Sequence, residues 1–261
     1  MNQTINVIKK SLSLVLAKEM MYKFNFFVRF LTLATFDLII PLMTFLTYQN
    51  TNGFPNWNID QMLLFQSIAI FVNGLDRTFF WRAGWTVADE VRNGTFDRLL
   101  LLPINTIKFI IFKSVGLEHL GEVIISIALM SYTIIRLNIT ITASILFMFF
   151  LFVLLSMIFY FSILLIRISI IVVNIKAARV GELTRTIKSF ASYPTSIFGK
   201  AMSFILRYIF PLAIIAQFPA ELLLGRISDN IFIIGIVIIT FYIISNKIWK
   251  NTLKKYVSAG G

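Results

Sequence analysis

Apolar runs of about 20 residues, separated by short polar or basic segments, constrain this chain more than any other feature. Such runs begin near residues 24, 61, 115, 143, 201 and 231. A helix of about 20 apolar residues crosses the hydrocarbon core of a bilayer. Hydrophobic residues make up 58% of the 261 residues, above the roughly 45–50% of ordinary soluble domains. We therefore predict an all-α polytopic membrane protein, with six transmembrane helices in a single domain over residues 1–261.

The six predicted spans differ in regularity. Four lie at 24–46, 61–80, 115–135 and 231–245. The run over 143–173 is longer than one perpendicular span needs, so we expect it to project into the cytoplasm. The fifth span starts near residue 201 and is interrupted by Pro211 and Pro219. Ahead of the first span, residues 4–22 are amphipathic at helical spacing, which predicts an interfacial helix on the cytoplasmic leaflet, in contact with anionic membrane lipids.

Basic residues predict which side of the membrane each connection faces. Lys and Arg total 24, and only Arg136 and Arg226 fall in segments that the pattern places outside. Cytoplasmic connections carry the excess of Lys and Arg, so we expect both termini inside, with cytoplasmic loops over 81–113 and 174–200. Residues 218–230 form an outer re-entrant or short-helix region in this prediction. The asymmetry explains the net charge of +12 without nucleic acid, and the absence of Cys suits the cytoplasmic (inner) membrane of a bacterium, where we expect this chain to lie.

Residue types that the sequence lacks exclude several functions. It has no Cys, which rules out disulfides and thiolate metal sites. It has no Gly-x-x-x-x-Gly-Lys-Ser/Thr phosphate-binding loop, so ATP hydrolysis would need another polypeptide. The single histidine lies in Glu118-His119-x-x-Glu122, and one His cannot supply a paired zinc site. We expect these groups to cap or pair locally, and we predict neither a metal site nor an enzyme.

The segment over residues 90–103 is charged, contains a glycine and ends on Pro103, between two apolar runs. Charges this dense are costly in hydrocarbon, so the segment lies in water beside the membrane. Gly94 ends a first short helix, and an apolar face at i, i+3 and i+4 follows it. We interpret the segment as a docking element; the alternative is a loop whose leucines dip into lipid. Phe96, Leu99 and Leu100 form the apolar face with Phe96 as the anchor, and Glu90, Arg92, Asp97 and Arg98 form the rim.

Polar residues inside the spans are candidates for a translocation path. Asp37 lies mid-span, four residues before Pro41, and an acid there is a functional candidate by default. It could instead pair with an arginine such as Arg29, or form a polar contact between two halves. Gln66 and Asn73 either line the path or hydrogen-bond between helices. Pro211, Pro219 and Glu221 indicate a broken segment near the outer face, because freed backbone groups must be satisfied inside protein.

Two stretches of the sequence resemble the ABC-2 type permeases. After the second span, Val91-Arg92-Asn93-Gly94-Thr95-Phe96-Asp97-Arg98-Leu99-Leu100-Leu101-Leu102-Pro103 is similar to the pattern Ile-Arg-x-Gly-x-Leu-Asp-x-x-Leu-Leu-Arg-Pro of one subgroup. The second stretch combines Tyr193-Pro194 with Phe218-Pro219-Ala220-Glu221, similar to that subgroup's Tyr-Pro before the fifth span and Pro-Ala after it. Leu102 replaces the subgroup's arginine before the loop proline, which removes any ion pair at that position.

This resemblance implies an ABC-2 (type V exporter-like) fold. It implies a permease that exports a drug, peptide or lipid-like compound. Its partners would be two copies of a cytoplasmic ABC ATPase and a second permease chain, identical or homologous. The chain itself would bind no cofactor, because ATP and Mg belong to the ATPase. A polysaccharide or teichoic-acid exporter is the alternative within transport, and a stand-alone ion-coupled carrier or an intramembrane enzyme are the alternatives outside it.

Overall fold

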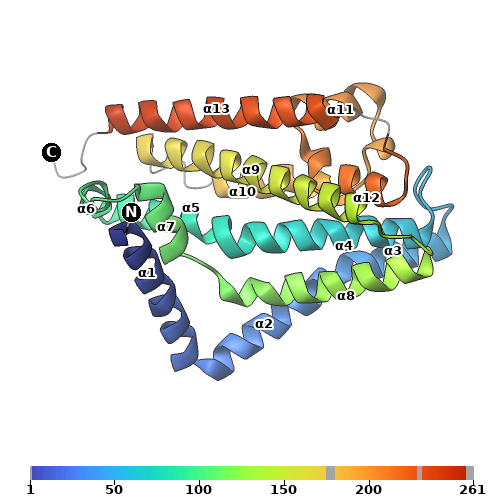
Figure 1. Cartoon of the computed structure of the whole chain (residues 1–261), viewed down its shortest axis with the longest axis horizontal. Coiled ribbons are helices and arrows are strands. Elements are labelled where there is room, and N and C mark those ends of the chain that lie inside the picture. The colour runs from blue at the N-terminus through green and yellow to red at the C-terminus, as the bar shows by residue number, and fades with distance from the viewer. Residues whose placement is uncertain (1, 175–179, 228–230, 257–261) are drawn as a thin grey trace.

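A computed structural model describes residues 2–174, 180–227 and 231–256, and all the regular structure in these residues is helical (Figure 1). Most helices run along one long axis, so the molecule has two ends. The helices are α1 (Asn2–Met21), α2 (Lys23–Asp37), α3 (Ile39–Asn50), α4 (Ile59–Asp76), α5 (Arg82–Arg92), α6 (Phe96–Leu100), α7 (Thr106–Lys113), α8 (Leu120–Arg136), α9 (Ala143–Val173), α10 (Val180–Ser189), α11 (Lys200–Phe204), α12 (Gln217–Leu223) and α13 (Ile231–Lys255). One end, the α6 end, holds α6, α7, the start of α1 and the last turns of α13; the other, the loop end, holds the α3–α4 and α8–α9 connections (Figure 1).

Four helical segments of the described residues are long and apolar enough to cross a membrane. They are Lys23–Asn50, Leu117–Arg136, Ala143–Val173 and Ile231–Lys255. These correspond to the predicted first, third, fourth and sixth spans. The predicted second span lies on α4, and the predicted fifth lies on a series of short helical pieces.

The first predicted span is broken at Leu38, between α2 and α3. Pro41 explains the break, because its ring excludes the carbonyl of the residue four positions earlier and it has no N–H to donate. That earlier residue is Asp37. The break therefore falls where the span carries its acid.

Helix α4 forms the centre of the molecule and is buried along most of its length. The side chain of Asn58 accepts a hydrogen bond from the backbone N–H of Gln61, whose side chain accepts from Asn58 N–H in return, a capping box that begins the helix. At its far end α4 passes through a π-helical turn, Arg77–Trp81, directly into α5. Such turns are frequent at functional sites. The turn carries Arg77 inward and extends the helix toward the α6 end.

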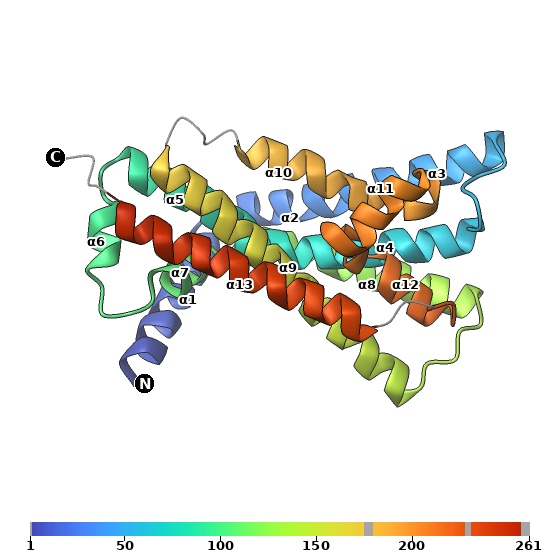
Figure 2. The same cartoon turned by 90° about the horizontal axis from the view of Figure 1, so that it is seen from above.

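Residues 180–226 differ from the predicted arrangement. The charge pattern predicts a cytoplasmic loop over 174–200, yet α10 runs back along the molecule toward the loop end (Figure 2). There Ser196 donates to the carbonyl of Pro55 at 3.3 Å, and the ring of Tyr193 lies 6.2 Å from that of Phe54. Phe54 and Pro55 belong to the connection between the first two predicted spans, which lies outside when the N-terminus is inside, so residues predicted on opposite sides of the membrane are in contact. Of that predicted loop, residues 175–179 lie outside the described residues, as do 228–230 of the predicted outer region.

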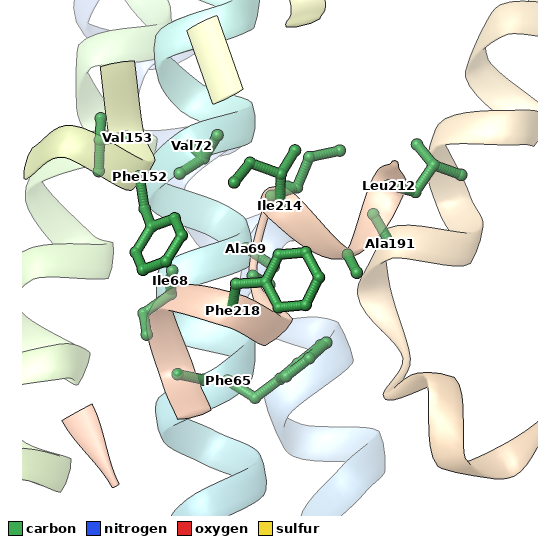
Figure 3. Close-up of a cluster of buried hydrophobic side chains, with 14 of the residues drawn as sticks. Phe65, Ile68, Ala69, Val72, Phe152, Val153, Ala191, Leu212, Ile214 and Phe218 are labelled. Carbon is green, nitrogen blue, oxygen red and sulfur yellow. The ribbon is translucent and has the colours of Figure 1, made fainter. Parts of the chain in front are cut away.

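Two clusters of buried apolar side chains hold the helices together. The larger joins α4, α9, α12 and α13, with Phe152 stacked on Phe218 at 6.3 Å (Figure 3). The second lies at the α6 end and joins α5, α6, α7, α9 and the last turns of α13. Both views show α13 beside α9 (Figures 1 and 2). Helix α9 therefore runs through both clusters and links the two ends.

Candidate functional site

Three groups of residues could carry function: the segment over 90–103, a charged network between helices, and a cavity at the loop end. The segment begins where α5 ends. Gly94 adopts φ +65°, and the N–H groups of Gly94 and Thr95 donate to the carbonyls of Val91 and Glu90 at 3.2 and 2.9 Å. This hydrogen-bond pair is a Schellman motif, which needs a left-handed residue. Gly94 ends the first short helix, as predicted.

Phe96 is not exposed, as a docking anchor would have to be. Its side chain is fully buried in the second apolar cluster, and its ring meets that of Tyr256 edge-on at 5.3 Å. Leu99 is also buried, and Leu100 packs against the same cluster. The amphipathic face that the sequence offers is thus covered by the chain's own second apolar cluster, to which α5, α7, α9 and α13 contribute. Helical periodicity identifies such a face but cannot tell which surface covers it.

The exposed surface of this segment is basic, with one apolar side chain. Leu101 is 84% exposed, the highest value among the large apolar side chains of the described residues. Arg92, Arg98 and Pro103 of the same segment are also exposed, and so is Lys108 in the following helix α7. Arg92 makes a loose ion pair with Asp89 at 3.7 Å. The surface therefore combines an apolar point with positive charge.

Glu90 faces inward rather than outward. Its carboxylate accepts from Lys113 Nζ at 2.6 Å and from the hydroxyl of Thr95. Burial acts to raise the pKa of Glu90, but the hydrogen bonds from Lys113 and Thr95 outweigh it and hold that pKa below its ordinary value. Glu90 thus fastens α5 to α7 and does not form part of a rim. Asp97 is half-buried.

Charged side chains gather between α2, α4 and α8. Arg77 pairs with Asp37 at 2.9 Å and with Glu122 at 2.6 Å, and Glu122 also meets His119 Nδ1 at 2.7 Å. Asp37 therefore has an arginine partner, as one prediction allowed, but the partner is Arg77. Arg29 pairs with Glu19 at 2.6 Å instead. His119 and Glu122 pair locally, as predicted.

A second buried ion pair fastens α10 to α4. Lys188 Nζ donates to Asp76 Oδ2 at 2.6 Å and lies 4.1 Å from the centre of the Tyr160 ring. The Tyr160 hydroxyl donates to Asn73 Oδ1. Asp76 is only 3% exposed, and a buried charge persists only when paired. The pair thus holds a polar helix against the central one.

Arg167 lies in the last two turns of the longest apolar helix, α9, and is buried. Its guanidinium carbon is 4.9 Å from the ring centres of both Trp81 and Trp85. Gly84 and Gly181 make room for it, because a Cβ on either would lie under 3.0 Å from guanidinium atoms. A desolvated cation between two indole rings is a favourable arrangement. Arg167 thereby ties α9 to α5 and α10.

The predicted path candidates occupy three separate places. Asp37 and Asn73 line one cavity of about 540 Å³, together with Asp76, Arg77, Arg185 and Lys188. Gln66 is buried and donates to Thr44 Oγ1 at 2.5 Å, which is the interhelical bond of the alternative prediction. Asn73 also makes such a bond, with Tyr160.

Glu221 lines a different cavity, of about 590 Å³ at the loop end. Its carboxylate accepts from Arg207 at 2.6 Å and from Gln217 at 2.7 Å. The segment that carries Pro211 and Pro219 is broken, and its backbone polar groups find hydrogen-bond partners inside the protein, as expected. The Ser156 hydroxyl donates to the carbonyl of Ile214 at 2.9 Å, and Gln217 Oε1 accepts from Thr195 N–H at 2.8 Å.

Several residues of the network are not among those that the sequence pattern predicts. Arg167 has a visible signal, since it is the one charged residue in the run over 143–173, and a charge within a span is a functional candidate. Asp76 and Arg77 stand together at the end of the second span. Lys188 has no such signal, because it lies in a basic stretch that the charge rule places in water.

Most of the chain is similar to one known protein family. Residues 31–260 match the model of a family described as "ABC-2 family transporter protein". A comparison with curated proteins gave no match. The matched range contains the segment over 90–103, the charged network and both cavities.

Proposed function

The chain belongs to the ABC-2 family of transporter proteins, and we propose that it is the permease subunit of an ATP-driven exporter. Membership implies partnership with ABC ATPase components. We propose two copies of a separate ATPase, which bind ATP and Mg, and a second permease chain, identical or homologous. The chain crosses the bacterial cytoplasmic membrane six times in this proposal, with both termini and the α6 end in the cytoplasm.

The exposed surface of the segment over 90–103 is the feature that carries the proposed coupling. Leu101 replaces Phe96 as the anchor, because Leu101 stands out from the surface and Phe96 is inside the protein. Arg92, Arg98 and Lys108 add exposed positive charge to this part of the chain, which fits an apolar groove with an acidic rim on the ATPase. A small apolar anchor ringed by charge is typical of a protein interface.

The route by which motion would reach the membrane is the second apolar cluster. Phe96 and Leu99 of α6 pack with Ile168 and Leu165 of α9 and with Trp249 of α13. Close-packed interiors transmit displacement instead of absorbing it. In the proposed cycle, ATP draws the two ATPase subunits together, their movement displaces α6, and α9 and α13 tilt to open a path between two permease chains.

Crosslinking tests the coupling surface, since the chain has no Cys of its own. A single Leu101→Cys variant, carrying a photoactivated crosslinker in native membranes, is expected to capture a soluble protein with a Walker A sequence, identified by mass spectrometry. Ile141→Cys is the matched control, because it is also exposed (48%) but lies in the α8–α9 connection. Capture of lipid alone by Leu101→Cys, with labelling verified, contradicts the coupling role and favours a stand-alone carrier.

The proposal extends to the class of substrate that the permease carries. The cavity that holds Asp37 and Asn73 has charged and apolar walls together, which suits an amphiphile better than a glycan. Substrate-stimulated ATP hydrolysis by the assembled transporter separates the two classes. Stimulation by a soluble anionic glycan, and not by amphiphiles, would move the proposal to a polysaccharide or teichoic-acid exporter.

A further inference from the structure

The 540 Å³ cavity has two chemically different walls. One wall consists of Leu33, Phe36 and Ile40 from the first candidate span. The other carries charged groups from α4, the π-helical turn and α10, and Asp37 of the first span joins it through its ion pair with Arg77. A volume of several hundred cubic ångströms is that of a small-molecule binding site.

The apolar wall faces the surroundings of the bundle. Phe36 is 63% exposed and Ile40 is 40% exposed, and both belong to a segment long and apolar enough to cross a membrane. Exposed apolar side chains at that depth contact hydrocarbon. An alkyl chain can therefore lie along this wall and still reach the cavity.

Asp76 supplies an unfilled hydrogen-bond acceptor. Its Oδ2 is occupied by Lys188, but its Oδ1 is buried and has no hydrogen-bond partner among the described residues. An unsatisfied buried acceptor is unfavourable, and in a native structure it needs an explanation. Asp76 lines the cavity, so a ligand N–H donor that reaches this carboxylate would satisfy Oδ1, which is shielded from solvent in the structure.

Arg185 supplies an available positive charge. It lines the same cavity from α10, its side chain is exposed, and it makes no ion pair within the described part of the chain. The other two cations of the cavity are engaged, Arg77 with Asp37 and Glu122, and Lys188 with Asp76. An acidic group entering the cavity would therefore meet Arg185, whose guanidinium binds carboxylate or phosphate in two-point geometry.

We propose that this cavity binds the head of a zwitterionic amphiphile. Its ammonium N–H donates to Asp76 Oδ1, its acidic group pairs with Arg185, and its apolar chain lies along Leu33, Phe36 and Ile40. This inference rests on the proposed permease function and names the substrate class. A bilayer phospholipid and an exported acylated amino compound share this chemistry and differ in the linkage between the head and the acyl chain.

Cysteine protection tests the site with the whole chain in detergent. Ser189 lines the cavity and is exposed, so the maleimide labelling rate of Ser189→Cys reports occupancy. The probes are lysophosphatidylethanolamine, lysophosphatidylcholine with the same acyl chain, and Nε-lauroyl-lysine. The choline head has no N–H donor, whereas the other two probes carry an ammonium group and an acidic group. Ser196→Cys, exposed at the loop end, reports any general effect of the probes on labelling.

We expect the two ammonium probes to slow labelling of Ser189→Cys at concentrations roughly tenfold or more below that needed for the choline probe, since a charge-assisted hydrogen bond is worth at least that factor. Protection by the lysophospholipid alone indicates a bilayer lipid, and protection by the acyl-lysine alone indicates an exported compound. Equal protection by all three probes, or by none, overturns the inference.

Two variants locate the contacts. Arg185→Ala removes an exposed, unpaired cation and should weaken protection by both ammonium probes about tenfold, whereas Arg136→Ala, a surface arginine of α8, should not. The double variant Asp76→Asn/Lys188→Gln replaces the ion pair by a neutral hydrogen-bonded pair and should abolish the preference for ammonium over choline. Unchanged protection in Arg185→Ala contradicts the proposed anion contact.

The outcome is independent of the coupling test. Protection of Ser189→Cys needs no ATPase. If Ser189→Cys is not protected but Leu101→Cys captures an ATPase, only the headgroup site is contradicted. If Ser189→Cys is protected but Leu101→Cys captures no ATPase, only the proposed coupling is contradicted.

Discussion

At the scale of single residues, Phe96 and Leu101 differ in burial although they lie only five positions apart on one segment. Phe96 is fully buried and Leu101 is 84% exposed. Loss of transport in a Phe96 variant would therefore report damage to the fold and not loss of docking. Leu101 is the residue whose removal tests docking without disturbing the core.

We expect Phe96→Ala to lower the free energy of unfolding by about 3–5 kcal/mol, because it removes a buried ring and leaves a cavity. Leu101→Ala should change it by less than about 0.5 kcal/mol, as exposed substitutions generally do. Thermal or denaturant unfolding of the two purified variants in the same detergent measures both effects. Equal stability of the two variants would show that Phe96 is not packed as described.

Glu90 gives a pH-dependent prediction, also for a single side chain. Its folded pKa lies below the ordinary value of 4.5, so its stabilising contribution is full above about pH 4.5 and is lost as pH falls through the folded pKa. Glu90→Gln should therefore be less stable than the wild type at pH 7. The difference should shrink as pH is lowered below 4.5. A difference that stays constant with pH would show that the contact with Lys113 is not ionic in character.

Among the helices, the placement of α10 decides which groups face one another. This helix is short and polar, and it is held by Lys188 on Asp76 and by the close approach of Gly181 to Arg167. It brings Arg185 and Lys188 to a cavity whose other residues include members of α2, α3, α4 and the π-helical turn. Without α10 in this place, neither the cavity nor its charge pattern would exist.

Gly181→Ala should displace α10, because the added Cβ would lie 2.8 Å from Arg167 Nη2 and 3.3 Å from Trp85. We expect a loss of about 1–3 kcal/mol in the free energy of unfolding, the usual cost of overpacking. Gly235→Ala in α13 is the matched control, since a Cβ added there would have no neighbour within 4 Å. That variant should gain up to about 1 kcal/mol from helix propensity. Similar effects of both variants in unfolding experiments would contradict the tight packing at Gly181.

Over the whole molecule, the charges are distributed less one-sidedly than the sequence suggests. Lys200 and Arg207 line the cavity at the loop end with Arg226. These three basic residues lie at the same end as Arg136, because residues 190–226 fold against the α3–α4 connection. The charge rule still distinguishes the two ends, and the basic surface around Leu101 remains at the α6 end.

Labelling from one side of the membrane checks this arrangement. With an impermeant maleimide added outside intact cells, Ser196→Cys and Ile141→Cys should react, because both residues lie at the loop end. Leu101→Cys should react only after permeabilisation. If Ser196→Cys reacts only after permeabilisation, as Leu101→Cys does, while Ile141→Cys reacts from outside, residues 174–200 form the cytoplasmic loop that the charge pattern predicts.

Local composition and backbone chemistry are enough to predict several features of this protein. The apolar runs specify α9 at the predicted residues and the other candidate spans, because the bilayer requires length and apolarity of each helix separately. Gly94 specifies the end of α5 through its positive φ, and Pro41 accounts for the break beside Asp37. The two motifs, in the loop and around the fifth span, indicate the family that the match over residues 31–260 confirms.

Which faces and charges meet depends on tertiary packing. Phe96 and Leu101 have similar apolar character, and the difference between core and surface arises from the second apolar cluster, whose members on α9 and α13 are distant in the chain. Asp37 needs an arginine, but Arg29 and Arg77 are equivalent in the sequence until packing brings one of them to 2.9 Å. Lys188 has the pattern of a solvated charge and is buried because Asp76 and the ring of Tyr160 compensate it. Such contacts arise from long-range packing, and local sequence pattern carries no information about it.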